Sequence, residues 1–323
     1  MKKAGSAVSY LIAFVIILMI NFLLPRAMPG DPLMAIYGEE ALIAMTPELQ
    51  AELTQRFSLD KPLGAQFVSY IKALLHGDMG YSYYYNAPVF DVIAASLPWT
   101  LLLVGLAVLI SNLLGIILGI ESGYRRGKTT DKVLLTGLIS LSGFPDFFIG
   151  ILLLLFFGVA LGIVPLAGAL TPYAGKTGLA LIIDVLHHLA LPLIALVIVR
   201  VTGAYLLTRN TMVTTLGEGF ILTAKAKGCR EREIRYRHAG RNSLLPVVTA
   251  AGLQLASSVT GALFIEIIFS YPGVGSLLYN SLLTRDYPLM QGILLVTTVV
   301  ILVANYLLDL LYTRLDPRVA YSH

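Results

Sequence analysis

Six long apolar stretches constrain the fold of this chain more than any other feature. They cover residues 7–24, 99–120, 133–161, 187–209, 246–269 and 289–312, and Pro145 within the third predicts a kink there. Each is long enough for an α-helix to cross the roughly 30 Å apolar core of a bilayer. Only 13% of the residues are charged, against about 25% in soluble domains. We therefore predict an all-α integral membrane protein with six transmembrane helices.

The positive charges indicate an orientation for these helices. With six spans and both termini in the cytoplasm, sixteen of the 23 Lys and Arg residues fall on the cytoplasmic side. Six fall outside, and Arg200 remains in the membrane. Cytoplasmic loops of membrane proteins carry such an excess of Lys and Arg. The sequence therefore predicts a multi-pass protein of the cell (inner) membrane with both termini cytoplasmic.

The spacing of the apolar stretches divides the chain into three parts. Residues 1–25 hold the first transmembrane helix, because no small-residue cleavage site follows that would make it a signal peptide. Residues 26–96 are predicted to be a small, partly helical extracytoplasmic insert, and residues 97–323 a core of five further transmembrane helices. In the insert, Thr46 is a predicted N-cap, and a helical stripe from Leu63 ends at Gly77.

A basic segment between the fourth and fifth stretches stands out from the apolar chain around it. It contains seven Lys and Arg residues but only three acidic residues, Glu218, Glu231 and Glu233. The pattern is helical up to Lys227, breaks at Gly228–Cys229 and becomes helical again. We predict a helical hairpin within a cytoplasmic loop, residues 210–245, that docks a partner protein. The alternative is a charged loop that only orients the chain.

Composition excludes several kinds of chemistry. The single cysteine, Cys229, excludes an internal disulfide and a Cys-based metal site. The sequence has no phosphate-binding glycine loop and no nucleophile motif, so no cofactor is expected on this chain and no covalent catalysis. The net charge is +4, but the basic residues are not interleaved with aromatic residues that could stack on bases, which argues against binding of nucleic acid. The adjacent His187 and His188 point about 100° apart on a helix, so we interpret them as hydrogen-bonded interfacial residues.

Motifs in the basic segment resemble those of a known family. Thr223-Ala-Lys-Ala-Lys-Gly228, Arg237-His238-Ala-Gly-Arg-Asn242 and Pro246 are similar to the coupling loop of ABC importer permeases, in the dipeptide/oligopeptide/nickel branch. Further matching motifs run from Pro29 to Val319: Pro29–Pro32, Leu59–Leu63, His76–Ser82, Tyr271–Gly275, Arg285–Pro288 and Leu315–Val319. The sizeable insert after the first helix is typical of the first of the two permeases. One departure is Leu222, which stands where the general family pattern has Glu, and the nearest acid is Glu218.

The resemblance implies a function and a set of partners. The chain would be a non-catalytic permease subunit that translocates small peptides or nickel and other metal chelates. It would pair with a second, homologous permease in the lipid bilayer. Two ATP-binding subunits, which hold ATP and Mg²⁺, would dock below, and an extracytoplasmic binding protein would deliver substrate. The residues implied in ATPase coupling are Glu218, Ala224, Lys225, Ala226, Lys227, Gly228, Arg237, His238 and Asn242.

Two other classes of membrane protein compete with this interpretation. An ATP-independent channel would share the apolar spans but would not co-purify with an ATPase. An intramembrane hydrolase would need a nucleophile and base, or metal ligands, at membrane depth. Ser111, Ser140 and Ser142 lie in the predicted spans, but no histidine lies deep in any of them, which disfavours a hydrolase.

Two further groups are candidate sites. Counting the helical rise from Val133 and from Arg209 places Asp146 roughly 20 Å and Arg200 roughly 14 Å above the cytoplasmic boundary. An unpaired charge there costs at least about 2.5–3.5 kcal/mol. Asp146 and Arg200 are thus a buried pair or charges in the translocation path, with Glu266 as another possible partner. Tyr83 and Tyr84 in the insert are candidates for binding-protein docking or for the aromatic belt of the membrane.

Overall fold

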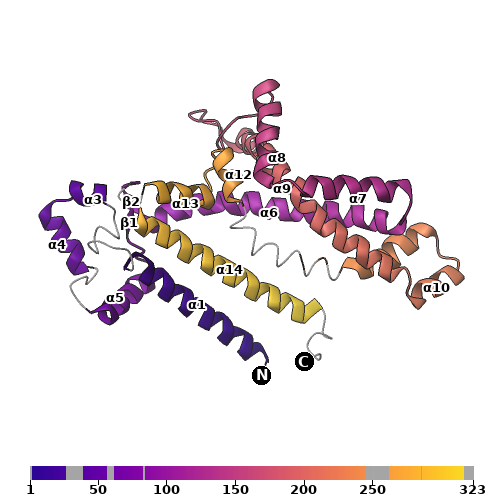
Figure 1. Ribbon diagram of the computed structural model, residues 1–323, viewed down its shortest axis with the longest axis horizontal. Coiled ribbons are helices and arrows are strands. Elements are labelled where there is room, and N and C mark those ends of the chain that lie inside the picture. The colour runs from indigo at the N-terminus through magenta and orange to yellow at the C-terminus, as the bar shows by residue number, and fades with distance from the viewer. Residues whose placement is uncertain are drawn as a thin grey trace. The chain divides into compact units, whose positions relative to one another are not determined.

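The computed structural model describes residues 2–26, 39–56, 62–82, 84–244, 247, 250, 262–284 and 286–315 (Figure 1). The described residues are helical apart from loops and one two-stranded antiparallel sheet, in which β1 (Tyr81–Ser82) pairs with β2 (Ala87–Pro88). The helices form two compact units. One comprises Met1–Thr100 with Pro272–Tyr306, and the other comprises Leu101–Tyr271 with Leu307–His323.

The first unit begins with α1 (Lys2–Arg26) and three short helices, α3 (Glu39–Ala44), α4 (Pro47–Arg56) and α5 (Leu63–Leu75). Thr46 accepts a hydrogen bond from the Leu49 backbone N–H at 3.3 Å, as expected of the predicted N-cap. Helix α5 ends before Gly77, whose φ of 77° lies in the left-handed region. The aromatic ring of Phe22 on α1 packs against the ring of Phe67 on α5, with centroids 5.1 Å apart.

The same unit is completed by α13 (Val274–Leu283) and α14 (Tyr287–Leu315), which pack on the start of α6 (Val89–Tyr124). Their core consists of Val89, Ile93, Val274, Leu277, Leu289 and Ile293. Gly292 on α14 lies so close to the Val89 side chain that a Cβ there would overlap it. Helices α1 and α14 are joined by reciprocal hydrogen bonds between Asn21 and Gln291, at 3.0 and 2.7 Å.

The second unit is built on α6 and α9 (Gly178–Thr215). Three glycines of α6, each four residues from the next, face α9: Gly115, Gly119 and Gly123. A Cβ on them would lie 2.5, 2.6 and 2.8 Å from the Cβ atoms of Ala204, Thr208 and Met212, respectively. Small residues at this spacing let two helix backbones approach closely, which is a common way to pack helices in membranes.

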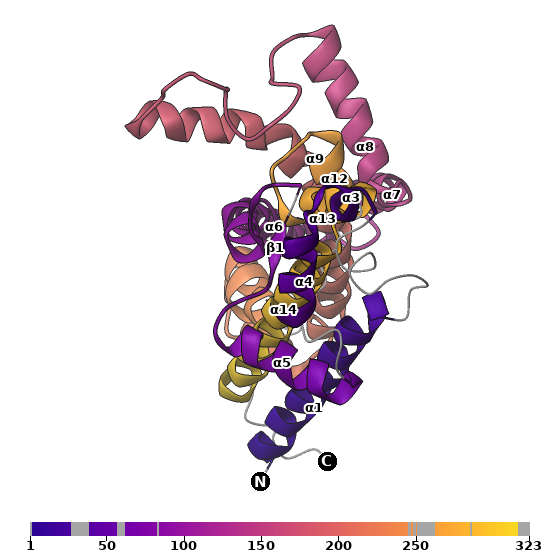
Figure 2. The same cartoon turned by 90° about the vertical axis from the view of Figure 1, so that its left-hand side faces the viewer.

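Helix α7 (Thr129–Ser142) is followed by α8 (Asp146–Leu153), which continues as the π-helix η1 (Leu154–Ala160). The sequence predicted one span over 133–161 with a kink at Pro145, and the two parts meet there at 95° (Figure 2). Proline has no backbone N–H and disfavours helical geometry at the preceding residue. The depth assigned to Asp146 above assumed a continuous helix from Val133. Because the helix turns by 95° before Asp146, that count of helical rise does not give its depth.

Three described helices are long and apolar enough to cross a membrane: Val89–Tyr124, Gly178–Thr215 and Tyr287–Tyr306. The bent pair of α7 with α8 and η1 would be a fourth. The predicted first span coincides with α1, whose described apolar part, Leu11–Leu23, is shorter. The predicted fifth span, residues 246–269, lies mostly outside the described residues. The count of six therefore stays a prediction.

Some predicted boundaries were wrong. Helix α6 begins ten residues before the predicted start at Trp99, and α9 begins at Gly178, nine residues before the predicted start at His187. The short helix α13 begins within the Tyr271–Gly275 motif and was not predicted. Asp91 and Asp184 interrupt the apolar runs near the starts of α6 and α9, although both residues lie within the helices.

The glycine contact between α6 and α9 gives a test of the second unit. Gly119→Ala places a methyl group against the α9 backbone and should lower the free energy of unfolding by about 1–3 kcal/mol. Gly105→Ala is the matched control, because nothing lies within 4 Å of a Cβ at that position of the same helix. It should leave stability unchanged or raise it slightly, since Ala is the better helix former. Thermal unfolding in detergent measures the stability of both variants. An equal change in stability in the two would contradict the close packing of α6 on α9.

Candidate functional site: the basic hairpin after α9

The basic segment forms a compact hairpin of two short helices, α10 (Gly219–Ala226) and the π-helix η2 (Glu233–Gly240). Helix α10 ends in a Schellman motif: Gly228 N–H donates to the Lys225 carbonyl at 2.9 Å, and Cys229 N–H donates to the Ala224 carbonyl at 3.2 Å. Gly228 has a φ of 76°, which a residue with a Cβ adopts only at a cost. The break predicted at Gly228–Cys229 is thus present.

One face of the hairpin is buried against the ends of α6 and α9. The core beneath it consists of Ile120, Met212, Ile221, Ala224, Ile234 and Ala239. Ile221 and Ala224 lie three residues apart and therefore share the inner face of α10. Because these side chains come from four helices, the hairpin is fixed on the helix ends by apolar packing and not only by its chain connections.

The other face of the hairpin is exposed and basic. Of the residues predicted to couple to an ATPase, seven are exposed: Glu218, Lys225, Ala226, Lys227, Gly228, Arg237 and Asn242. His238 is half-buried. Ala224 is only 6% exposed, so it packs within the hairpin and is not available to a partner. Leu222, at the position where the family has Glu, is 64% exposed, and Phe220 beside it is 42% exposed.

A charged cluster at the end of α6, which the sequence did not reveal, holds η2. Glu121 forms ion pairs with Arg125, at 2.6 Å, and with Arg235, at 2.8 Å. The Arg235 guanidinium also lies over the Tyr124 ring, 4.2 Å from its centroid. Partial burial disfavours the charged guanidinium, but Glu121 and the Tyr236 hydroxyl outweigh this effect and raise the pKa of Arg235. Arg235 therefore stays charged at every physiological pH.

A second charged network, also missed, ties the start of α7 to α9. Arg209 donates to both carboxylate oxygens of Asp131, at 2.6 and 2.8 Å. Asp131 also accepts from the Ser122 hydroxyl and the Gly127 backbone N–H. Ser122 in turn is hydrogen-bonded to the hydroxyl of Tyr205, at 2.7 Å. In the sequence Arg209 is one of many cytoplasmic positive charges, whereas in the structure it is the bidentate partner of a buried carboxylate, since Asp131 is only 3% exposed.

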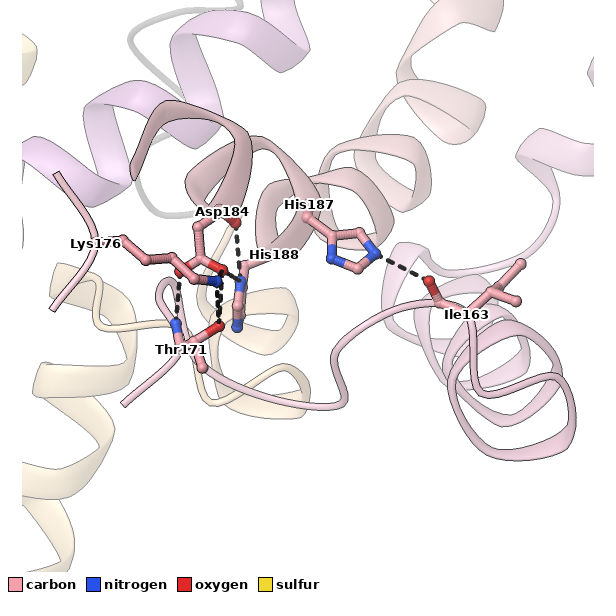
Figure 3. Close-up of polar contacts among 6 residues, drawn as sticks. All are labelled: Ile163, Thr171, Lys176, Asp184, His187 and His188. Atoms are coloured by element: carbon pink, nitrogen blue, oxygen red, sulfur yellow. Dashed lines mark hydrogen bonds and ion pairs between the residues drawn. The ribbon is translucent and has the colours of Figure 1, made fainter. Parts of the chain in front are cut away.

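His187 and His188 lie near the start of α9, where hydrogen bonds fold the preceding loop onto the helix (Figure 3). His187 Nε2 donates to the Ile163 carbonyl at 2.9 Å, and His188 Nδ1 donates to the Asp184 carbonyl at 2.9 Å. Asp184 binds the loop through Thr171 and Lys176. Both histidines are hydrogen-bonded, as interpreted from the sequence. Among the described residues, no three His, Cys, Asp or Glu side chains are grouped to hold a metal ion.

The charges predicted at membrane depth lie where α8, α9 and α12 (Leu263–Ile268) pack together. Asp146 is the first residue of α8, and its carboxylate accepts the Phe147 backbone N–H at 2.8 Å. Burial disfavours the charged form of the half-buried Arg200 on α9, and nearby Asp146 offsets only part of this cost. Glu266 on α12 is completely buried. The structure thus brings Asp146 and Arg200 into one region.

In the first unit, the turn between β1 and β2, which carries Tyr84 and Tyr85 and is called the tyrosine turn below, is held by the buried carboxylate of Asp286. Asp286 accepts the Ser82 hydroxyl at 2.5 Å and the Leu289 backbone N–H at 3.1 Å. Burial raises the pKa of Asp286 despite these hydrogen bonds. Tyr84 is 63% exposed, and its ring packs against that of Tyr85. Tyr83 lies outside the described residues.

Comparison with known families places the chain in a class. Residues 111–321 match the family described as binding-protein-dependent transport system inner membrane component. Residues 4–104 match the N-terminal domain of the membrane component of such systems. The chain therefore belongs to this family and is the multi-pass membrane component of a binding-protein-dependent transport system.

Individual relatives are similar over nearly the whole length. A di/tripeptide transport system permease from Pseudomonas aeruginosa is 36% identical, with 94% of each chain covered. A dipeptide transport system permease from Escherichia coli K12 is 34% identical, with 96% of this chain and 95% of the relative covered. An oligopeptide transport system permease from Bacillus subtilis is 32% identical, with 94% of each covered.

A solved structure supports the fold. It is described as an amino acid ABC transporter with histidines, and it superposes with a TM-score of 0.51 at 16% identity. The match covers 69% of this chain and 94% of the other.

Proposed function

We propose that this chain is one of two permeases of an ABC importer for dipeptides and short oligopeptides, and that the basic hairpin docks the ATP-binding subunit. The exposed basic face of a hairpin that is itself fixed on α6 and α9 carries the proposal. A surface that transmits force must resist deformation, and the apolar core under the hairpin meets that requirement. The relatives named above are peptide permeases, which favours peptides over nickel or another metal chelate as substrate.

The wider assembly follows from this role. We propose six spans with both termini cytoplasmic, which the distribution of Lys and Arg supports. A second permease completes the path, two ATP-binding subunits hold ATP and Mg²⁺, and a binding protein delivers the peptide. ATP-driven closure of these subunits displaces the hairpin, and the displacement tilts the helices attached to it. This chain contributes no bond-breaking chemistry.

The hairpin proposal is tested by Gly228→Asp. The positive φ makes any Cβ there cost roughly 1 kcal/mol or more, and the carboxylate adds negative charge to a basic face. The variant should insert in the membrane, fail to co-purify with the ATP-binding subunit and lose transport.

Gly219→Asp is the charge-matched control, because Gly219 begins α10 in open space and without a positive φ. An acid at a helix N-terminus is favourable, so this variant should keep the ATP-binding subunit. Normal transport by Gly228→Asp contradicts the proposal, and a wild-type chain that never co-purifies with an ATPase favours the channel.

We further propose that Tyr83 and Tyr84 contact the binding protein. The exposure of Tyr84 on a turn held by Asp286 supports this, because a fixed aromatic loses little entropy on docking. Tyr84→Ala together with Tyr83→Ala should weaken binding-protein association, measured by surface plasmon resonance on nanodiscs, and leave basal ATP hydrolysis intact. Unchanged affinity assigns these tyrosines to the membrane belt instead.

For Asp146 and Arg200 we propose a structural ion pair near the junction of α8, α9 and α12. Burial disfavours the Arg200 charge, and the proximity of Asp146, which offsets part of this cost, supports the pair. Arg200→Ala should impair folding or assembly, and exchanging the two residues, Asp146→Arg with Arg200→Asp, should partly restore it. Size-exclusion profiles and transport assays separate the outcomes. Normal assembly of Arg200→Ala with loss of transport would instead place the arginine in the translocation path.

A further inference from the structure

The ion pair between Glu121 and Arg235 joins segments that are 114 residues apart in the sequence. Glu121 lies in the last turn of α6, and Arg235 lies in η2 of the hairpin. Arg235 Nη1 donates to Glu121 Oε2 at 2.8 Å. The Arg235 guanidinium also lies over the ring of Tyr124, another α6 residue. Two neighbouring side chains of α6 therefore hold the same guanidinium.

The burial of this pair distinguishes it from an ordinary surface ion pair. The side chain of Arg235 is 16% exposed and that of Glu121 is 23% exposed. Partly buried charges are screened less by salt than exposed ones. The other partner of Glu121, Arg125, is 42% exposed and belongs to the same helix, so that contact does not connect the hairpin to anything.

Close backbone packing accompanies the ion pair. A Cβ added to Gly240 at the end of η2 would lie 3.1 Å from the Ile120 side chain of α6. By contrast, the hairpin's covalent connection to α9 runs through the short turn Leu216–Gly217–Glu218, which is not part of a regular helix. The apolar core attaches the hairpin to the helix ends, but dispersion contacts do not fix its direction, so a force on it could be lost in rotation about that turn without a directional contact.

We propose that Glu121 and Arg235 are positioning residues that lock the hairpin onto the end of α6. Displacement of the hairpin then moves α6 and α9 together instead of being absorbed at the Leu216–Glu218 turn. The inference rests on the proposed docking of the ATP-binding subunit to the hairpin. It assigns a role in coupling to α6, a helix that has no direct chain connection to the hairpin.

The first test is the amount of peptide transported per ATP hydrolysed. The complete transporter, with both permeases, the ATP-binding subunits and the binding protein, is reconstituted in proteoliposomes and supplied with a mixture of di- and tripeptides. Glu121→Gln and Arg235→Gln should each lower the ratio of peptide transported to ATP hydrolysed about tenfold. Loss of one charge-assisted hydrogen bond changes an equilibrium constant by about this factor. The double variant should be no worse than either single variant, because each already breaks the pair.

Arg125→Gln is the matched control and should keep the wild-type ratio, because it removes only the contact within α6. Tyr124→Leu removes the ring under the guanidinium but keeps apolar packing, and it should lower the ratio less than Glu121→Gln. A normal ratio in both Gln variants of the pair overturns the proposal. An equal fall in Arg125→Gln also overturns it, because the effect would then be one of charge near the hairpin in general.

The second test reads the position of the hairpin without transport. In a Cys229→Ser background, spin labels are attached at Phe220→Cys on α10 and Leu113→Cys on α6, both of which are exposed in the native chain. Pulsed EPR should show one narrow distance distribution in the parent and in Arg125→Gln, and a broader one in Glu121→Gln. Equally narrow distance distributions in the parent, Arg125→Gln and Glu121→Gln would overturn the proposal that the ion pair locks the hairpin onto α6.

Co-purification separates this inference from the proposed function. The Glu121 and Arg235 variants should still retain the ATP-binding subunit, because the docking face is intact. If the wild-type chain itself does not retain that subunit, the proposed function fails. If it does, and the variants keep both the subunit and the wild-type ratio, only the lock fails.

Discussion

The close contact between α6 and α9 is the interaction on which the second unit depends. Gly115, Gly119 and Gly123 allow the two backbones to approach within a distance at which any side chain would overlap. Within a bilayer the lipid tails are as apolar as the side chains, so helix association depends on close packing rather than on exclusion of water. The same contact brings the ends of both helices together, and there they form the apolar base on which the hairpin sits.

Charged residues at these helix ends fix what the apolar contact leaves adjustable. Asp131 and Arg209 orient α7 against α9 through two parallel hydrogen bonds, and Glu121 and Arg235 orient the hairpin against α6. A bidentate pair specifies direction as well as distance, which dispersion contacts do not. Apolar burial therefore supplies the attachment of the hairpin, and the directional hydrogen bond of Arg235 to Glu121 supplies its proposed orientation.

The first unit follows the same division. Val89, Leu289 and Ile293 supply an apolar core, while Asp286 holds the tyrosine turn through Ser82. A buried carboxylate with an elevated pKa is an expensive anchor, and its bonds to a hydroxyl and a backbone N–H offset that cost. Asn21 and Gln291 bond α1 to α14 in the same way, each satisfying a backbone carbonyl of the other helix.

The sequence alone determined what depends on spacing along the chain. The apolar stretches located the long helices, Pro145 located the bend after α7, and Gly228 located the end of α10, because each reflects a local backbone rule. The motifs of the basic segment were enough to indicate the family. Only the tertiary structure decided which side chains meet. Glu121 and Arg235, or Asp131 and Arg209, are ordinary charges near basic loops when seen in sequence, and they become partners because the glycine face of α6 packs closely on α9. Likewise, Ala224 shares a motif with Lys225, yet the 100° between successive residues of a helix turns one into the core and the other toward solvent.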